Sequence, residues 1–194
     1  MAARLAADTA EQILDAAERR AQTVGYHGFS YADVAGELSL TTASVHYHFP
    51  AKADLGARLI ERYTSRFLEA LADIEARASA ASDRLRAYVQ IYEDVVAANR
   101  MCLCGMLASE YETLPVAMRE RLGDFFAKNE AWVTALLTAG RASGELSYAG
   151  DPKATASALV SALEGAMLVA KAHGGLASFK AAAQVMLGNL IGPR

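Results

Sequence analysis

The pattern of apolar and polar residues predicts helices along the whole chain. From residue 52 to about residue 78, apolar side chains recur with a period near the ~3.6 residues of an amphipathic helix. These positions are Leu55, Leu59, Ile60, Tyr63, Phe67, Leu71 and Ile74. Periodic runs of β-branched residues, which are typical of strands, do not occur, and only 4 prolines interrupt the 194 residues. The sequence therefore predicts an all-α fold with about nine helices.

Breaks in this pattern indicate where the helices begin and end. Gly25 is expected to end a first helix that starts near residue 9. Pro50 separates the third helix from the long fourth one, and Ser82 is expected to cap the fifth. The remaining helices are expected over about residues 100–112, 115–142, 152–172 and 176–190.

Residues 29–55 carry the most specific local pattern. Ser30 is a good N-cap for a short helix with an apolar stripe, and residues 39–41 break that stripe. Either Thr41 or Thr42 can cap a second short helix that is rich in hydrogen-bonding side chains. Two helices joined by so short a turn are the elements of a helix-turn-helix, whose second helix fits the major groove of DNA.

Several motifs follow one another in this part of the chain. They are Ile13-Leu14-Asp15-Ala16-Ala17, Gly25-Tyr26 with Phe29-Ser30, Asp33-Val34-Ala35, and the run from Val45 through His46, Tyr47, His48, Phe49, Pro50 and Lys52 to Asp54-Leu55. In order and spacing, residues 9–55 resemble the DNA-binding domain of the TetR family of bacterial transcriptional regulators. The resemblance implies a three-helix DNA-binding domain, residues 1–51, and a helical domain for ligand binding and dimerisation, residues 52–194.

By this resemblance, one face of the second short helix contacts DNA, while Val45 and Phe49 face the core. The residues expected at the DNA are Thr41, Thr42, Ser44, His46, Tyr47, His48 and Lys52. Lys52, at the start of the fourth helix, is expected to meet a phosphate. The alternative for any one of these residues is that it only caps or packs. Ser39 stands where the family usually has glycine, which predicts a strained turn, and Thr42 stands where a lysine is common.

Residues 100–114 contain Cys102 and Cys104, two positions apart. A disulfide at this spacing is strained, and no second group of cysteines or histidines completes a zinc site. One interpretation is a thiol sensor, in which Arg100 activates a cysteine whose modification by an electrophile or oxidant releases DNA. The preferred interpretation is that both cysteines are buried core residues, which is common for free cysteine. His46 and His48 do not share a helix face, so no metal site is expected.

Aromatic and sulfur-containing side chains in the central helices predict the walls of a ligand pocket. Apolar walls with a few polar tips suit a small molecule, and the family that the chain resembles usually binds an inducer between these helices. The residues expected at the ligand are Tyr63, Tyr88, Tyr92, Met106, Glu110 and Trp132. Glu110 is the polar anchor in this prediction, with a solvated helix end as its alternative. For the aromatic residues the alternative is an ordinary core position.

The segment 152–172 is apolar almost all round, although Glu164 lies near its middle. Such a helix must be buried, and together with the last helix it predicts a four-helix bundle made by two copies of the chain. The last helix contributes Phe179, Val185, Met186 and Leu190. A homodimer places its two recognition helices about one DNA turn, ~34 Å, or a multiple of it apart, which predicts a palindromic operator. The alternative is a core formed within one chain.

Charge and composition exclude several classes of protein. A net charge of −3 excludes a globally basic nucleic-acid binder. No nucleophile–base pair, phosphate-binding loop or metal-ligand spacing is present, so we expect neither enzymatic activity nor a cofactor. The segment 154–170 is short for a membrane span and carries an acidic residue, and no basic region followed by an apolar run opens the chain. We therefore expect a cytoplasmic protein without a membrane partner.

Together these patterns predict a ligand-responsive transcriptional regulator, acting as a repressor. It is expected to release a palindromic double-stranded DNA operator when a small-molecule inducer binds the C-terminal domain. Three alternatives stay open: an activator on the same scaffold, a thiol-based sensor of electrophiles or oxidants, and a helical interaction protein that does not bind DNA. The inducer, the operator sequence and the regulated genes are not encoded in these patterns.

The charge balance of the DNA-binding region yields a first prediction. Within the first sixty residues, Asp8, Glu11, Asp15, Glu18, Asp33, Glu37 and Asp54 oppose Arg4, Arg19, Arg20, Lys52 and Arg58. Because each phosphate that meets a cation releases counterions, so few cations predict a shallow fall of log affinity for DNA with log salt concentration. Fluorescence anisotropy at a series of salt concentrations measures this slope, and a steep slope contradicts the prediction.

Overall fold

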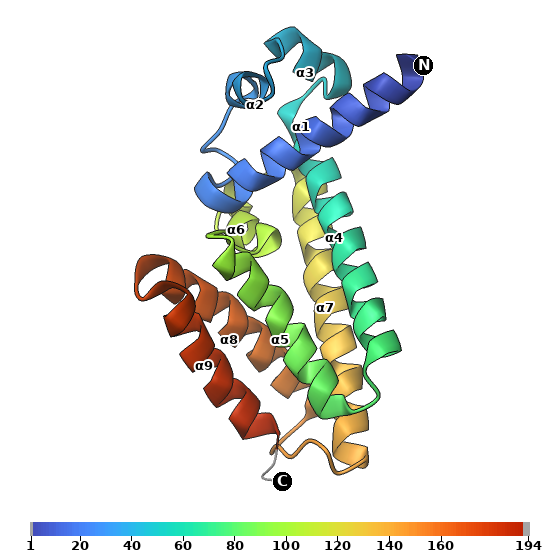
Figure 1. The fold of residues 1–194 in the computed structure, drawn as a ribbon, viewed down its shortest axis with the longest axis vertical. Helices are drawn as coiled ribbons and strands as arrows, with labels where there is room; N and C mark the ends of the chain where they lie inside the picture. The colour runs from blue at the N-terminus through green and yellow to red at the C-terminus, as the bar shows by residue number, and fades with distance from the viewer. Residues whose placement is uncertain (1, 192–194) are drawn as a thin grey trace. The chain divides into compact units, whose positions relative to one another are not determined.

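The computed structural model describes residues 2–191, and in this part of the chain it contains nine α-helices, one short 3-10 helix and no strand (Figure 1). The helices are α1 (Ala2–Val24), α2 (Tyr31–Leu38), α3 (Thr42–His48), α4 (Lys52–Arg77), α5 (Ala81–Ala97), α6 (Leu103–Ala108), the 3-10 helix η1 (Tyr111–Thr113), α7 (Val116–Ala142), α8 (Pro152–Ala172) and α9 (Gly175–Leu190). The all-α prediction is confirmed.

The caps around α2 and α3 have the geometry that the local sequence predicts. Ser30 and Asp33 form a capping box: the Ser30 hydroxyl accepts from the Asp33 N–H at 3.3 Å, and the Asp33 carboxylate accepts from the Ser30 N–H at 2.7 Å. Of the two candidate threonines, Thr41 caps α3 by accepting from the Ser44 N–H at 3.1 Å. Short polar side chains thus satisfy backbone donors at the start of both short helices.

Three expected helix bounds differ from the structure, and the first is the start of α1, which is Ala2 rather than a residue near position 9. The N-cap of α5 is Ala80 rather than Ser82, which lies within the first turn. The carboxylate of Glu145 accepts from the Ser82 N–H at 3.4 Å, so a side chain distant in sequence supplies the acceptor that a capping serine would have supplied. The helix expected over residues 100–112 is divided into α6 and η1, with Glu110 between them.

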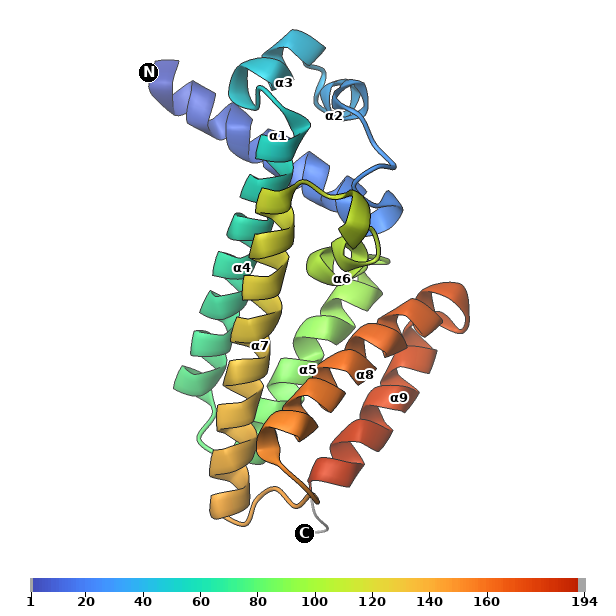
Figure 2. The ribbon, with the colours of Figure 1, turned by 180° about the vertical axis from the view of Figure 1, so that it is seen from behind.

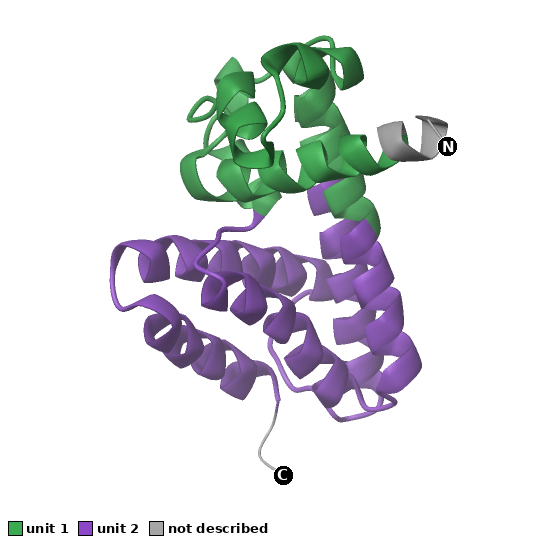
Figure 3. Ribbon diagram, turned by 45° about the horizontal axis from the view of Figure 1, so that its top comes forward, with its two compact units in different colours: residues 1–65, 103–123 green, residues 66–102, 124–194 purple. Residues whose placement is uncertain are grey.

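The chain forms two compact units, drawn in two colours in Figure 3. The first contains the residues up to Ser65 together with Leu103–Gly123, and the second contains Arg66–Cys102 and the residues from Asp124 onward. Helices α4 and α7 therefore contribute residues to both units, whereas α6 and η1 belong to the first. Each unit has its own buried apolar residues, as expected for separate hydrophobic cores.

In the first unit, a single arginine joins α1 to α4. Arg62 on α4 is only 12% exposed and lies 2.9 Å from Glu11, from Asp15 and from Glu18 on α1. Beneath these pairs, apolar residues of α1, α2, α3 and α4 are fully buried. They include Ile13, Leu14, Val34, Val45, Leu55 and Leu59. The arginine is stabilised because three carboxylates compensate its charge in a partly buried position.

The turn between α1 and α2 is held by two charged side chains of opposite sign. The Glu110 carboxylate accepts from the backbone N–H of Tyr26 at 2.7 Å and from that of His27 at 3.4 Å. The Lys52 ammonium donates to the backbone carbonyls of Tyr26 and Phe29. Gly25 at φ +82° lies against Glu110, and a Cβ there would meet a carboxylate oxygen at 2.5 Å. This turn is thus fixed through its own backbone groups.

In the second unit, α8 packs along α9, and α5 packs against both (Figure 2). Asp151 caps α8 by accepting from the Ala154 N–H at 2.9 Å, and Pro152 occupies the first turn. Within the described residues, α8 is the one helix long and apolar enough to cross a membrane, a property that core helices of helical bundles share. Leu163 and Met167 of α8 and Phe179 of α9 are completely buried.

Between α2 and α3, Ser39 adopts the left-handed conformation that the sequence analysis associates with glycine. Its φ is 55° and its ψ is 36°, and it forms the C-cap of α2. A residue with a Cβ is strained in this region, whereas glycine is not. The expected strain in the turn of the helix-turn-helix is therefore present in the backbone.

Removing the glutamate that holds the first turn should destabilise the first unit. We expect Glu110→Ala to lower the free energy of unfolding by about 1–3 kcal/mol, because two backbone N–H groups lose their acceptor and one of them belongs to buried Tyr26. Urea denaturation followed by circular dichroism measures the change. Glu112→Ala, at an exposed position two residues away, is the matched control, and equal stability of the two variants would contradict the assignment.

Relieving the strain in the turn between α2 and α3 should stabilise the protein. We expect Ser39→Gly to raise the free energy of unfolding by roughly 1 kcal/mol, because the native left-handed backbone no longer carries a Cβ. Ser79→Gly, at an exposed position without a positive φ, should give no gain. The same urea denaturation compares both variants, and a destabilised Ser39→Gly protein would show that the serine side chain contributes more than its strain costs.

Candidate nucleic-acid interface and ligand site

The second helix of the helix-turn-helix, α3, presents a polar face to solvent. Tyr47 is 79% exposed, and Thr42 and His46 are also exposed, whereas Ser44 and His48 are half-buried. On the opposite face Val45 is completely buried. The helix therefore packs against the core on one face and leaves its polar face exposed, as a helix that contacts bases in a DNA groove requires.

Contacts at its C-terminal end orient α3 and one of its histidines. The Tyr31 hydroxyl of α2 donates to the Phe49 carbonyl at 2.8 Å, and the His46 ring packs edge-on against Tyr31 with centroids 4.6 Å apart. His46 Nδ1 lies 3.3 Å from the Pro50 carbonyl oxygen. Because a carbonyl only accepts, Nδ1 carries the proton in this bond, and Nε2 of the neutral ring is an acceptor.

The contact of Lys52 with a phosphate stays a prediction, and in the structure this side chain is bound within the first unit. Its ammonium donates to two carbonyls of the α1–α2 turn and lies 4.6 Å and 4.3 Å from the ring centroids of Tyr26 and Phe29. Burial lowers the pKa of Lys52 from its ordinary value, although the nearby Glu110 and Asp33 carboxylates oppose this effect. The lysine is thus engaged inside the first unit, because backbone carbonyls and aromatic faces compensate its charge there.

Other cations of the first unit are also paired. Arg19 and Arg20 contact the two oxygens of Glu37 at 2.7 Å and 3.1 Å, and Arg58 contacts Glu61 at 3.0 Å. These pairs are exposed, so each contributes little stability, and a phosphate can compete for the arginines only by replacing their carboxylates. The pairing accords with the shallow salt dependence expected from the sequence.

In the second unit, three of the expected ligand residues come together in the interior. Trp132 of α7 stacks on Tyr88 of α5 with centroids 5.5 Å apart, and Tyr88 contacts Tyr92 at 5.4 Å. Asn129, which the sequence analysis did not select, links the tyrosines: it accepts from the Tyr88 hydroxyl at 2.8 Å and donates to the Tyr92 hydroxyl at 2.9 Å. Burial raises the pKa of both tyrosines well above the ordinary value.

Glu164 of α8 is the acidic member of this interior cluster. Burial raises its pKa to about 7, while a hydrogen bond from the Cys102 thiol works in the opposite direction. Its Oε1 atom is buried without a hydrogen-bond partner, as is Nε1 of Trp132. The sequence indicated that Glu164 is unusual, because it is a single acidic residue inside an otherwise apolar helix.

The other expected ligand residues belong to the first unit. Tyr63 and Met106 are half-buried there. Glu110, the expected polar anchor, also lies in the first unit, where its carboxylate binds the backbone of the α1–α2 turn. Its contact with a ligand stays a prediction. The sequence predicted that Glu110 lies near a helix end, but it did not predict that Glu110 binds the turn between α1 and α2.

Neither cysteine forms a disulfide, and both are buried. Cys102 is 3% exposed and Cys104 is completely buried, and they belong to different units. Reactive cysteines require solvent access and a positively charged environment, whereas the group that accepts a hydrogen bond from Cys102 is the Glu164 carboxyl. These surroundings support the interpretation as core residues. No cluster of three or more metal-ligating side chains occurs in residues 2–191.

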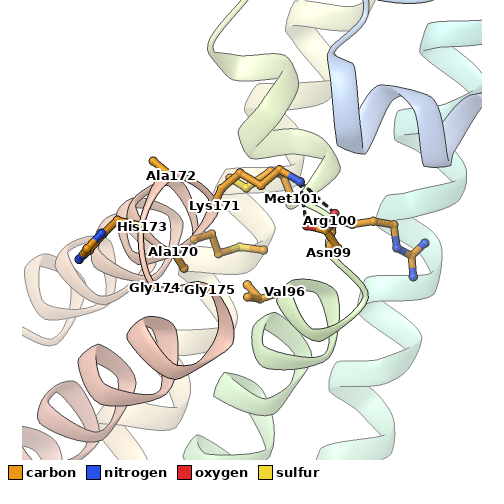
Figure 4. Close-up of a pocket in the computed structure, with 11 residues that line it drawn as sticks. Val96, Asn99, Arg100, Met101, Ala170, Lys171, Ala172, His173, Gly174 and Gly175 are labelled. Carbon is orange, nitrogen blue, oxygen red and sulfur yellow. Dashed lines mark hydrogen bonds between the residues drawn. The ribbon is translucent and has the colours of Figure 1, made fainter.

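The second unit also contains a cavity of about 180 Å³ beside the end of α8 (Figure 4). Met101 and Met167 give it an apolar side, and the Lys171 amine is bound to the carbonyl and side-chain oxygens of Asn99 at 3.1 Å each. Figure 4 shows Arg100 and His173 extending away from each other on opposite sides of the cavity. None of the residues expected at the ligand lines it.

Comparisons with known proteins agree with this architecture. Residues 13–59 match the family model described as bacterial regulatory proteins of the tetR family, and residues 81–186 match the tetracyclin repressor-like C-terminal domain. The first match contains the helix-turn-helix and the second contains the aromatic cluster with Glu164.

Relatives extend the similarity to nearly the whole chain. The chain is 32% identical over 151 residues to the transcriptional regulator AcuR of Cereibacter sphaeroides, which covers 76% of this chain and 69% of that protein. A TetR-family regulator from Agrobacterium tumefaciens superposes with a TM-score of 0.93 at 34% identity, over 96% of this chain and 100% of that one. A second from Legionella pneumophila has a TM-score of 0.80 at 29% identity, with 91% and 94% covered. The exposed recognition helix, the two matched domains and these relatives together show that the chain belongs to the TetR family of transcriptional regulators.

Proposed function

We propose that this regulator is a repressor that binds a palindromic operator and releases it when a small molecule binds the C-terminal domain. The observation that carries the proposal is α3, whose outward residues are polar and whose inward Val45 is completely buried. Its working compartment is the cytoplasm, where operator DNA and inducer meet. The division into a DNA-binding domain, residues 1–51, and a ligand-binding domain, residues 52–194, is part of the proposal.

The outward face of α3 supplies the base and phosphate contacts. Thr42, His46 and Tyr47 are the exposed members, while Ser44 and His48 contribute from half-buried positions. With Nδ1 held by the Pro50 carbonyl, neutral His46 offers Nε2 as an acceptor, which suits the amino groups of adenine or cytosine in the major groove. Thr41 acts chiefly through its cap, since its hydroxyl already accepts from Ser44.

Dimerisation through α8 and α9 completes the proposal. Leu168 and Val169 of α8 are each 57% exposed, and Val185 of α9 is 65% exposed, although the two helices pack together within one chain. Phe179 and Leu190, which the sequence assigned to the same interface, are instead buried within the chain. A second copy on the exposed residues forms a four-helix bundle, and its two-fold axis explains a palindromic operator.

Ligand response requires that the inducer favour a state that does not fit the operator. Helices α4 and α7 each run through both compact units without a break, so they are the elements proposed to carry the change. The sign of regulation depends on where the operator lies relative to the promoter, and an activator uses the same coupling.

The decisive test replaces the most exposed residue of α3. We expect Tyr47→Ala to weaken binding to the preferred operator at least fivefold, because one base or phosphate contact of about 1–3 kcal/mol is lost, while the fold is unchanged at a position that is 79% exposed. Operators selected from a random DNA pool and fluorescence anisotropy provide the measurement.

Tyr111→Ala is the matched control, because Tyr111 is 45% exposed in the first unit but lies on η1 rather than α3. We expect this variant to bind the operator like the unmodified protein. Equal binding of selected and scrambled DNA by the unmodified protein would instead support the alternative of a helical interaction protein that does not read DNA.

A further inference from the structure

Two polar atoms in the aromatic cluster of the second unit have no hydrogen-bond partner. Nε1 of the Trp132 indole is a hydrogen-bond donor, and Oε1 of the Glu164 carboxylate is an acceptor. Both atoms are buried. A buried polar atom left unpaired costs free energy, so each such atom indicates either strain or a group that binds there. One atom is a donor and the other an acceptor. Trp132 stacks on Tyr88, and the charge of Glu164 contributes to the raised pKa of Tyr88.

The remaining polar groups of the cluster are already satisfied by one another. Tyr88 donates to Asn129, Asn129 donates to Tyr92, and the two hydroxyls lie 3.0 Å apart, which closes a three-membered ring of hydrogen bonds. These residues therefore need no ligand for their polar atoms. What they offer to a ligand is the faces and edges of their rings.

Among the described residues, no cation contributes to the ionisation of Glu164. The two influences on its ionisation are burial and the hydrogen bond from Cys102. By contrast, Arg62 in the first unit has three carboxylates around it. A buried acidic group beside aromatic rings is complementary to a cation, which gains from the carboxylate and from the negative faces of the rings.

We propose that Glu164, Trp132 and Tyr88 form the recognition site for a small organic cation carrying a protonated or quaternary nitrogen. This inference rests on the proposed function, since it names the chemical class of the inducer. The cation contacts Glu164 Oε1 and the faces of the aromatic rings.

The cavity of Figure 4 belongs to the same unit as the proposed site, although Glu164, Trp132 and Tyr88 do not line it. Two of its lining residues flank the site along the chain: Met101 precedes Cys102, and Met167 follows Glu164 by about one helical turn.

Three probes with the same branched carbon skeleton and different charge test the proposal: isobutylammonium, isobutanol and isobutyrate. The chain has a single tryptophan, so the indole N–H of Trp132 gives one NMR signal at the site. We expect isobutylammonium to shift this signal saturably, with an affinity at least tenfold above that of isobutanol, and isobutyrate to leave it unchanged. Glu164→Gln should abolish the preference for the cation.

Glu130→Gln is the matched control, because Glu130 is a half-buried glutamate on α7 whose partner is the Ser157 hydroxyl at 3.0 Å. It should keep the preference. Equal shifts by all three probes, or a preference for isobutyrate, would overturn the assignment. The titration contains no DNA, so a failure here leaves the operator test unaffected, and a failure of operator binding leaves this result unaffected.

The pH dependence of the unmodified protein gives a second readout that needs no variant. The pKa of Glu164 is about 7, so the carboxyl is mostly ionised at pH 8 and mostly neutral at pH 6. A cation prefers the ionised form, and its affinity should therefore fall about tenfold from pH 8 to pH 6. Cys102 and the tyrosines 88 and 92 face the same carboxyl, and both tyrosines have raised pKa values and stay neutral in this range. An affinity independent of pH would contradict the proposal.

Discussion

The DNA-reading part of this regulator depends on how the turn between α1 and α2 is held. Glu110 binds two N–H groups of that turn and Lys52 binds two of its carbonyls, so a tight turn is fixed by charge-assisted hydrogen bonds rather than by its own side chains. Glycine at position 25 allows the carboxylate to come this close. The path of the chain into α2 and α3 follows from these bonds.

This arrangement places a segment of the second half of the sequence inside the first unit. Glu110 lies between α6 and η1, some eighty residues after the turn that it binds. The same stretch of chain begins at Cys102, whose thiol donates to Glu164 in the second unit. A short segment of the chain therefore contributes one contact to each core.

The interior of the second unit contains one group of polar atoms that hydrogen-bond to one another and a second group that lacks hydrogen-bond partners. The ring of hydrogen bonds among Tyr88, Tyr92 and Asn129 specifies one arrangement of α5 and α7, because each polar atom has its partner there. Glu164 and Trp132 lie beside this rigid group with atoms left unpaired. Rigid walls with a few unpaired groups are what selective recognition of a small molecule requires.

Local sequence was sufficient for the all-α fold and for the caps of α2 and α3, although not for the start of α5. Ser30 with Asp33, Thr41 and Gly25 act on backbone groups within a few residues, and the spacing of apolar side chains reports directly on which face is buried. The strain at Ser39 was expected from the resemblance instead, because the family usually has glycine at this left-handed position.

Tertiary structure alone decided the roles of the long charged side chains. Lys52 looked like a phosphate contact and Glu110 like a ligand anchor, yet both bind the same turn, and Asn129 joined two tyrosines without any signal in its neighbours. Flexible side chains reach partners far away in sequence, and burial makes such partners obligatory. Helical periodicity records which residues are buried, but it holds no information about the partner that a buried charge will find.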